Sequence, residues 1–134
     1  MNDDAGAAGA LAEAVVAALR NVAGLSRVSD GVPIQAGDAS AVVEMGPETD
    51  WGHKSGAGAE VRFAVLIGCA GEEPGRARVL LERARAAVDA VGPRVGGWRV
   101  VTLVTMRSRM VRAPGPKWTG VVEYRARMLR SGVG

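Results

Sequence analysis

Hydrophobic residues recur at helical spacing in two segments of the chain. In an alanine-rich stretch near the start, Leu11, Val15, Leu19 and Val22 share one face, which predicts a helix over residues 8–22 that stops before Gly24. Its apolar stripe is narrow, so this helix is expected to cover one side of a sheet. A second helix is predicted between Pro74 and Gly92-Pro93, with a buried face made of Ala77, Leu80, Leu81, Ala84, Val88 and Val91.

Four other segments alternate between apolar and polar residues, as half-buried strands do. They span residues 41–45, 59–70, 98–110 and 118–130. Residues 25–39 consist mainly of turn formers, and a proline there allows a short edge segment at most. The order helix, strand, strand, helix, strand, strand predicts an α+β fold. We expect an antiparallel or mixed four-stranded sheet with the two helices packed mainly on one face.

The alternation also predicts which side chains lie on the face of the sheet without helices. In the strand over residues 98–110, Trp98, Val100, Thr102, Val104 and Met106 should share one face, with Arg99, Val101, Leu103, Thr105 and Arg107 on the other. The open face would then carry these residues beside Val101 and Leu103: Arg62, Arg99, Arg107, Arg125 and Arg127. Arginines interleaved with aliphatic side chains favour a surface that contacts another molecule.

Composition narrows the class of protein. The 134 residues predict a single domain over 1–134 with flexible ends at 1–7 and 131–134, and a core built from aliphatic side chains because aromatics are only 4%. The net charge is +3, yet residues 107–130 hold seven basic residues against one acid, Glu123. That segment could face phosphate or an acidic protein, or it could be an ordinary solvated ribbon. The single cysteine excludes an internal disulfide, and no apolar run or leader suggests a membrane or secreted protein; synthesis in the bacterial cytoplasm is expected.

No motif in the sequence predicts an enzyme or a cofactor. Cys69 and His53 could form a nucleophile and a base, but Cys69 alternates with core positions. His53 with Asp50 and Glu60 is too loosely spaced to indicate a metal site. The glycines at 56 and 58 precede a strand and not a helix, so they do not form a phosphate-binding loop. We therefore predict no catalytic residue, no metal and no cofactor.

Short motifs in a fixed order resemble the small tail-completion, or tail terminator, proteins of long-tailed (siphovirus-like) phages and gene transfer agents. The resemblance covers residues 8–130. It rests on these segments: Thr49-Asp50-Trp51, Lys54-Ser55-Gly56, Gly58-Ala59-Glu60 with Arg62, Gly75, Gly97-Trp98-Arg99-Val100, and Gly120-Val121-Val122-Glu123-Tyr124-Arg125-Ala126. One departure is the turn over residues 113–117, which is rich in proline here where relatives carry an acidic, polar turn.

The resemblance implies a virion structural protein at the tail–neck junction. Such a protein forms a homo-hexameric ring at the head-proximal end of the tail tube, ends tube polymerisation and binds the neck (stopper) protein, while DNA passes through without sequence-specific binding. Under this hypothesis the loop over residues 50–60 and the hairpin tip over residues 110–118 make the ring or partner contacts. The expected interface residues are Asp50, Trp51, His53, Lys54, Glu60, Arg62, Arg99, Arg107, Arg109, Arg112, Lys117 and Trp118. The alternative is a basic nucleic-acid-binding α+β domain that uses the ribbon over residues 107–130.

Overall fold

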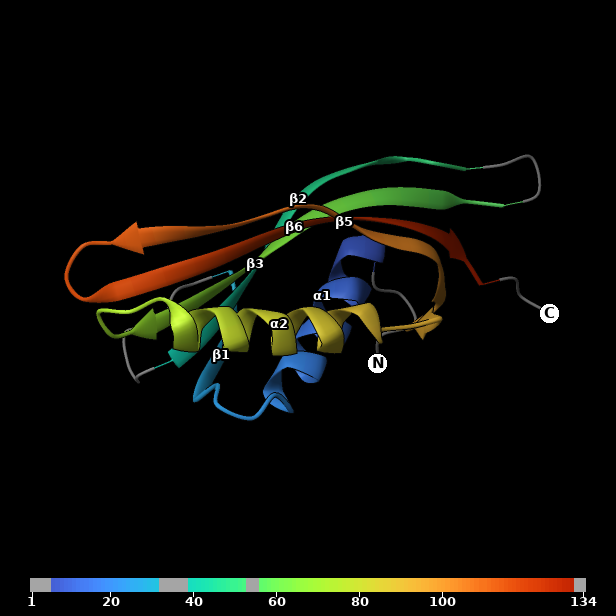
Figure 1. Ribbon diagram of the computed structural model, residues 1–134. Coiled ribbons are helices and arrows are strands. Elements are labelled where there is room, and N and C mark those ends of the chain that lie inside the picture. The colour runs from blue at the N-terminus through green and yellow to red at the C-terminus, as the bar shows by residue number, and fades with distance from the viewer. Residues whose placement is uncertain (1–5, 32–38, 53–55, 132–134) are drawn as a thin grey trace.

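The computed structural model of the protein describes residues 6–31, 39–52 and 56–131. Two helices and six strands occur in these ranges (Figure 1). The helices are α1 (Ala7–Arg20) and α2 (Gly75–Asp89). The strands are β1 (Arg27–Asp30), β2 (Ala39–Asp50), β3 (Gly58–Ala70), β4 (Arg94–Val95), β5 (Trp98–Ala113) and β6 (Lys117–Arg130).

All six strands belong to one mixed sheet with the order β1-β2-β3-β6-β5-β4. β1 runs parallel to β2, and the other neighbours are antiparallel. The prediction of a four-stranded sheet is therefore wrong, although the α+β class is right. Its two missing strands, β1 and β4, are only four and two residues long. Segments that short have no alternation to detect, and only their pairing with longer strands makes them part of the sheet.

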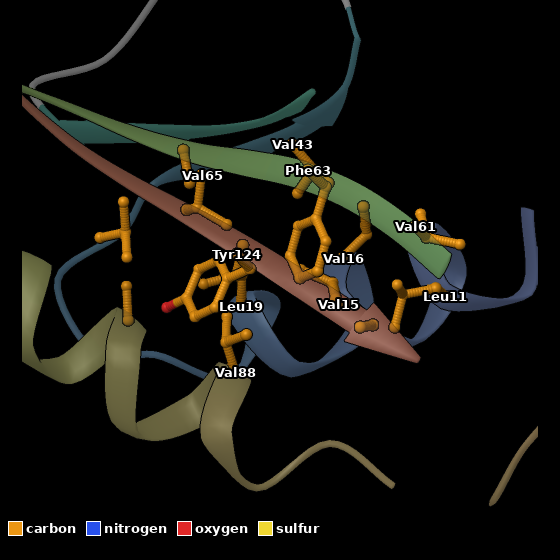
Figure 2. Close-up of a cluster of buried hydrophobic side chains, with 14 of the residues drawn as sticks. Leu11, Val15, Val16, Leu19, Val43, Val61, Phe63, Val65, Val88 and Tyr124 are labelled. Carbon is orange, nitrogen blue, oxygen red and sulfur yellow. The ribbon is translucent and has the colours of Figure 1, made fainter. Parts of the chain in front are cut away.

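Both helices pack on the same face of the sheet (Figure 1). The core lies between the sheet and the helices. The inward positions of β3 and β6 alternate along each strand, so Val61, Phe63 and Val65 lie beside Val122 and Tyr124. Figure 2 shows the rings of Phe63 and Tyr124 next to each other in this cluster; their centroids are 4.9 Å apart and the ring planes differ by 14°. Helix residues such as Leu11, Leu19 and Val88 close the cluster from the other side (Figure 2).

Helix α1 is tied to β2 by a contact that the sequence did not suggest. Its N-cap residue, Gly6, has no side chain, and the first turn carries no acid. Glu48 on β2 replaces both: its Oε1 accepts a hydrogen bond of 3.2 Å from the backbone N–H of Ala8. A carboxylate at this end of a helix satisfies a free N–H and interacts favourably with the helix dipole.

Two β-bulges in β5 change which of its side chains face the helices. Register shifts occur between Val100 and Thr102 and again between Thr105 and Arg107. Each bulge inserts one residue, so the alternation changes phase. Leu103 consequently pairs with the buried Ala126, on the helix side, whereas Val104 pairs with Arg125. The predicted faces of this strand are therefore wrong between the first bulge and Arg107, and Leu103 does not belong to the open face. The second bulge restores the original phase, so Arg107 lies on the open face opposite Glu123, as predicted.

Two hairpins extend beyond the helix layer at opposite ends of the sheet (Figure 1). The register explains this arrangement: Lys117 at the start of β6 pairs with Ala70 at the end of β3, and Leu129 near the end of β6 pairs with Gly58 at the start of β3. The β5–β6 turn thus lies at one end and the β2–β3 turn at the other. We call these the β5–β6 end and the β2–β3 end.

Candidate functional site

The face of the sheet opposite the helices, here the outer face, carries arginines as predicted, but several are paired. Glu60 on β3 contacts Arg127 on β6, with 3.0 Å between Oε1 and Nε, and lies 3.9 Å from Arg62. Arg107 on β5 contacts Glu123 on β6 at 2.7 Å between Nη2 and Oε2. Acidic side chains on the outer face therefore pair with these arginines and partly neutralise the positive charge of the face.

A shallow groove of about 440 Å³ crosses the outer face between β2 and β5. Apolar side chains from β3, β5 and β6 and charged side chains from all four strands line it. The apolar ones include Ala64, Leu66, Met106 and Val121, and the charged ones are Glu44, Arg62, Arg109 and Glu123. Met106 is 46% exposed, so the groove offers apolar area without enclosing a small molecule. This geometry suits contact with another protein surface better than it suits chemistry.

The β2–β3 end gathers one group of the predicted interface residues. The Oδ1 of Asp50 accepts a hydrogen bond of 3.1 Å from Gly52 N–H, which holds the start of the turn, and Trp51 N–H donates to the Gly58 carbonyl at 3.0 Å. The guanidinium of Arg127 lies 5.6 Å from the centre of the Trp51 ring. Glu60, Arg62 and Arg99 belong to this end of the sheet by register. His53 and Lys54 lie outside the described residues.

The β5–β6 end gathers the other group. Trp118 donates its indole N–H to the carbonyl oxygen of Glu72 at 3.0 Å, and the Arg112 guanidinium lies 5.7 Å from its ring. Arg109 and Lys117 are exposed beside them. Arg107 pairs with Glu123 in the middle of β6 and belongs to neither end. The other predicted interface residues that the structure describes form two separate groups, one at each end of the sheet.

The two long edges of the sheet are a feature that the sequence reasoning missed. β1 covers the edge of β2 only from Ser40 to Val43, and β4 covers the edge of β5 only at Trp98 and Arg99. Beyond these pairs, no strand among residues 6–31, 39–52 and 56–131 pairs with the edge of β2 that faces away from β3, or with the edge of β5 that faces away from β6. The signal that could have shown the β2 edge is its run of acids, because Glu44 and Glu48 precede the predicted contact residue Asp50.

The candidate chemical groups are not arranged as a catalytic or metal site in the part of the chain that the structure describes. Cys69 is buried on the helix side of β3, and His53 is outside the described ranges. Within those ranges no cluster of three or more His, Cys, Asp or Glu side chains could hold a metal ion. Neither described helix is long and apolar enough to cross a membrane. Burial raises the pKa of Tyr124, a core residue, and Asp89 acts in the same direction.

Comparison with known proteins identifies the family of the chain. The chain is similar over 94% of its length to a protein chain in a solved structure described as the virion of a native gene transfer agent particle, with 28% sequence identity, 99% of that chain covered and a TM-score of 0.66. No curated protein matches the chain. The family model described as tail completion protein gp17 matches residues 9–129. The chain therefore belongs to the tail completion protein gp17 family, as the sequence motifs indicated, and is a structural protein of a phage-like virion tail.

Proposed function

We propose that the protein is a tail terminator: six copies form a ring on the head-proximal end of the tail tube, stop its polymerisation and bind the neck protein. The observation that carries this proposal is the position of the two groups of predicted interface residues. They lie at opposite ends of one sheet, on hairpins that extend beyond the helices (Figure 1). A molecule with different contact surfaces at its two ends makes head-to-tail contacts, and such contacts form a ring when the rotation between copies closes.

The charges at the two ends support the same proposal. The β5–β6 end carries Arg109, Arg112 and Lys117, whereas the β2 strand that leads to the other end carries Glu44, Glu48 and Asp50. Opposite charges steer one end of a copy toward the other end of its neighbour and disfavour contact between like ends. The similar chain from a gene transfer agent particle supports a place in an assembled virion. The tube and neck proteins are the partners that we propose there.

The first test is the mass of the purified protein by light scattering, alone and with the tail tube protein. We expect a hexamer, or a monomer that forms a ring only on the tube end, and tubes that stop growing when the protein is present. A monomer that neither binds the tube nor limits its length would refute the proposal.

Variants at the predicted interface residues test the contact surfaces. Trp51→Ala at the β2–β3 end and Arg107→Ala on the outer face of β5 should prevent assembly while the circular dichroism spectrum stays that of the wild type. Arg78→Ala on the exposed side of α2 is a matched control that should assemble normally. Full assembly of the first two variants would show that these surfaces are not the contacts.

Nucleic-acid binding remains the second candidate because Arg99 and Arg109 are exposed on β5. The ion pairs of Arg107 and Arg127 with Glu123 and Glu60 reduce the charge available for phosphate. A nucleic-acid-binding domain would bind duplex DNA with a steep salt dependence, whereas a terminator would show weak contact that does not depend on DNA length. A salt titration of DNA binding separates the two functions.

A further inference from the structure

We infer that neighbouring copies join through the open edges of their sheets, with the basic edge of β5 in one copy beside the acidic edge of β2 in the next. This inference rests on the proposed ring and specifies the contact that builds it. Pairing of these edges would join the sheets of adjacent copies into one continuous sheet, whereas contact between hairpin tips would not.

The first observation is that each edge strand is covered only near its start. β1 pairs with β2 through Val43, after which the edge of β2 is open over residues 44–50 in the described structure. On the opposite side, Pro93 accepts a hydrogen bond of 2.6 Å from Val100 N–H, and the edge of β5 beyond that point has no strand partner among the described residues. Open edges expose unpaired N–H and C=O groups that can pair with a strand of another chain.

The second observation is that the two open edges have opposite charge. Residues 44–50 of β2 contain three acids and no base, and these acids are Glu44, Glu48 and Asp50. Residues 101–113 of β5 contain three bases and no acid, and these bases are Arg107, Arg109 and Arg112. All three arginines lie after the second bulge, in a segment that pairs with β6 without interruption from Arg107 to Ala113. The longest regular part of the β5 edge is therefore also its most basic part.

The same features disfavour the alternative pairings. Two β2 edges would bring acids together and two β5 edges would bring arginines together, and like charges oppose both contacts. The bulge between Met45 and Glu48, with Pro47 inside it, shortens the backbone ladder that the β2 edge can offer. Charge must then contribute to the choice of partner, and it permits only the β5–β2 combination.

The position of the edges also selects a ring over a dimer. The open part of β5 leads to the β5–β6 end, and the open part of β2 leads to the β2–β3 end (Figure 1). A copy that offers β5 to one neighbour still has a free β2 for another, so the contact is heterologous and each copy has two neighbours. A two-fold dimer would use the same edge in both copies, which the charges oppose.

Two complementary charge reversals test this pairing without knowledge of its register. The β5-reversed variant carries Arg109→Glu and Arg112→Glu, and the β2-reversed variant carries Glu44→Arg and Asp50→Arg. Glu48 is left unchanged because it binds the backbone of α1. Each variant alone places like charges at every contact, so we expect the concentration for half-assembly to rise by at least about tenfold.

Mixed in equal amounts, the two variants should form an alternating ring, because every contact then joins opposite charges. Native mass spectrometry of the wild type, each variant and the mixture, with tail tube protein added, measures this.

A matched control carries Arg20→Glu and Arg78→Glu on the exposed sides of α1 and α2, and it should assemble like the wild type. Assembly of either reversed variant alone, or failure of the mixture to assemble when the wild type does, overturns the edge pairing and leaves the proposed terminator function standing. A wild type that forms no ring under any of these conditions overturns both. Unfolded variants cannot produce a false success, because misfolded chains would not assemble on mixing.

Discussion

Replacing Tyr124 by phenylalanine should make the protein more stable. The Tyr124 side chain is 1% exposed, and its Oη has no hydrogen-bond partner among the described residues. A buried polar group without a partner costs about 1–3 kcal/mol. Phenylalanine keeps the ring that stacks on Phe63 and removes only the hydroxyl. We therefore expect Tyr124→Phe to raise the free energy of unfolding by about 1 kcal/mol at pH 7, which corresponds to a midpoint about 4 °C higher.

Urea titration followed by tryptophan fluorescence and circular dichroism measures this change, at a protein concentration where both proteins have the same mass. Tyr124→Ala is the control for burial and should lose about 3–5 kcal/mol, because it leaves a cavity under both helices. A Tyr124→Phe protein that is less stable than the wild type would show that the hydroxyl has a partner and that the reasoning is wrong.

The pH dependence gives an independent check at the same residue. Burial, assisted by Asp89, raises the pKa of Tyr124 above its ordinary value of 10.0, so the folded protein keeps a proton that the unfolded chain releases. The stability that this proton contributes is fully present below about pH 10 and decreases as the pH rises toward the folded pKa. Tyr124→Phe lacks this decrease, so its stability advantage should grow above pH 10. Because Tyr124 is the only tyrosine in the chain, phenolate absorbance should appear only on unfolding; ionisation near pH 10 in the folded state would contradict the burial argument.

Two further predictions concern β2 and β3. Glu48→Ala should lower the free energy of unfolding by about 1 kcal/mol, because the first turn of α1 loses the acceptor for Ala8 N–H and a favourable charge. Glu48→Gln should lower it by about half as much. Urea titration measures both variants, and a stability equal to that of the wild type would show that this contact contributes nothing. Gly58→Ala should lower the free energy of unfolding by about 2 kcal/mol, because its methyl group would lie 2.5 Å from the carbonyl oxygen of Trp51. Gly56→Ala is the control: its methyl group would meet nothing within 4 Å, so the free energy of unfolding should change by less than about 0.5 kcal/mol. Thermal unfolding of the two variants tests this, and similar melting points would refute it.

The surfaces predicted to make contacts illustrate what a sequence can specify and what it cannot. The ordered motifs, among them those that contain Trp51 and Trp98, identified the family. The loop over residues 50–60 and the hairpin tip over residues 110–118 were predicted as contact surfaces. The same pattern could not show that this loop and this hairpin tip lie at opposite ends of one sheet, because their positions depend on the register of β3 with β6. It also missed Glu44, whose importance comes from lying on an edge that β1 leaves open.

The sequence by itself determined the two helices, three of the long strands and the aliphatic core, because hydrophobic periodicity is local and a long element repeats it many times. It also carried the order of motifs that identifies the family. The first strand was predicted to end at residue 45, whereas β2 continues past Pro47 to Asp50. Only the tertiary structure decided that the sheet has six strands, which side chains of β5 face the helices, and which strand edges are open. β1 and β4 are too short to show a period and belong to the sheet only through their pairing with β2 and β5. The two bulges of β5 contain no glycine or proline that would mark them in the sequence. The contacts that we propose for the ring therefore depend on long-range register, which no local pattern of residues encodes.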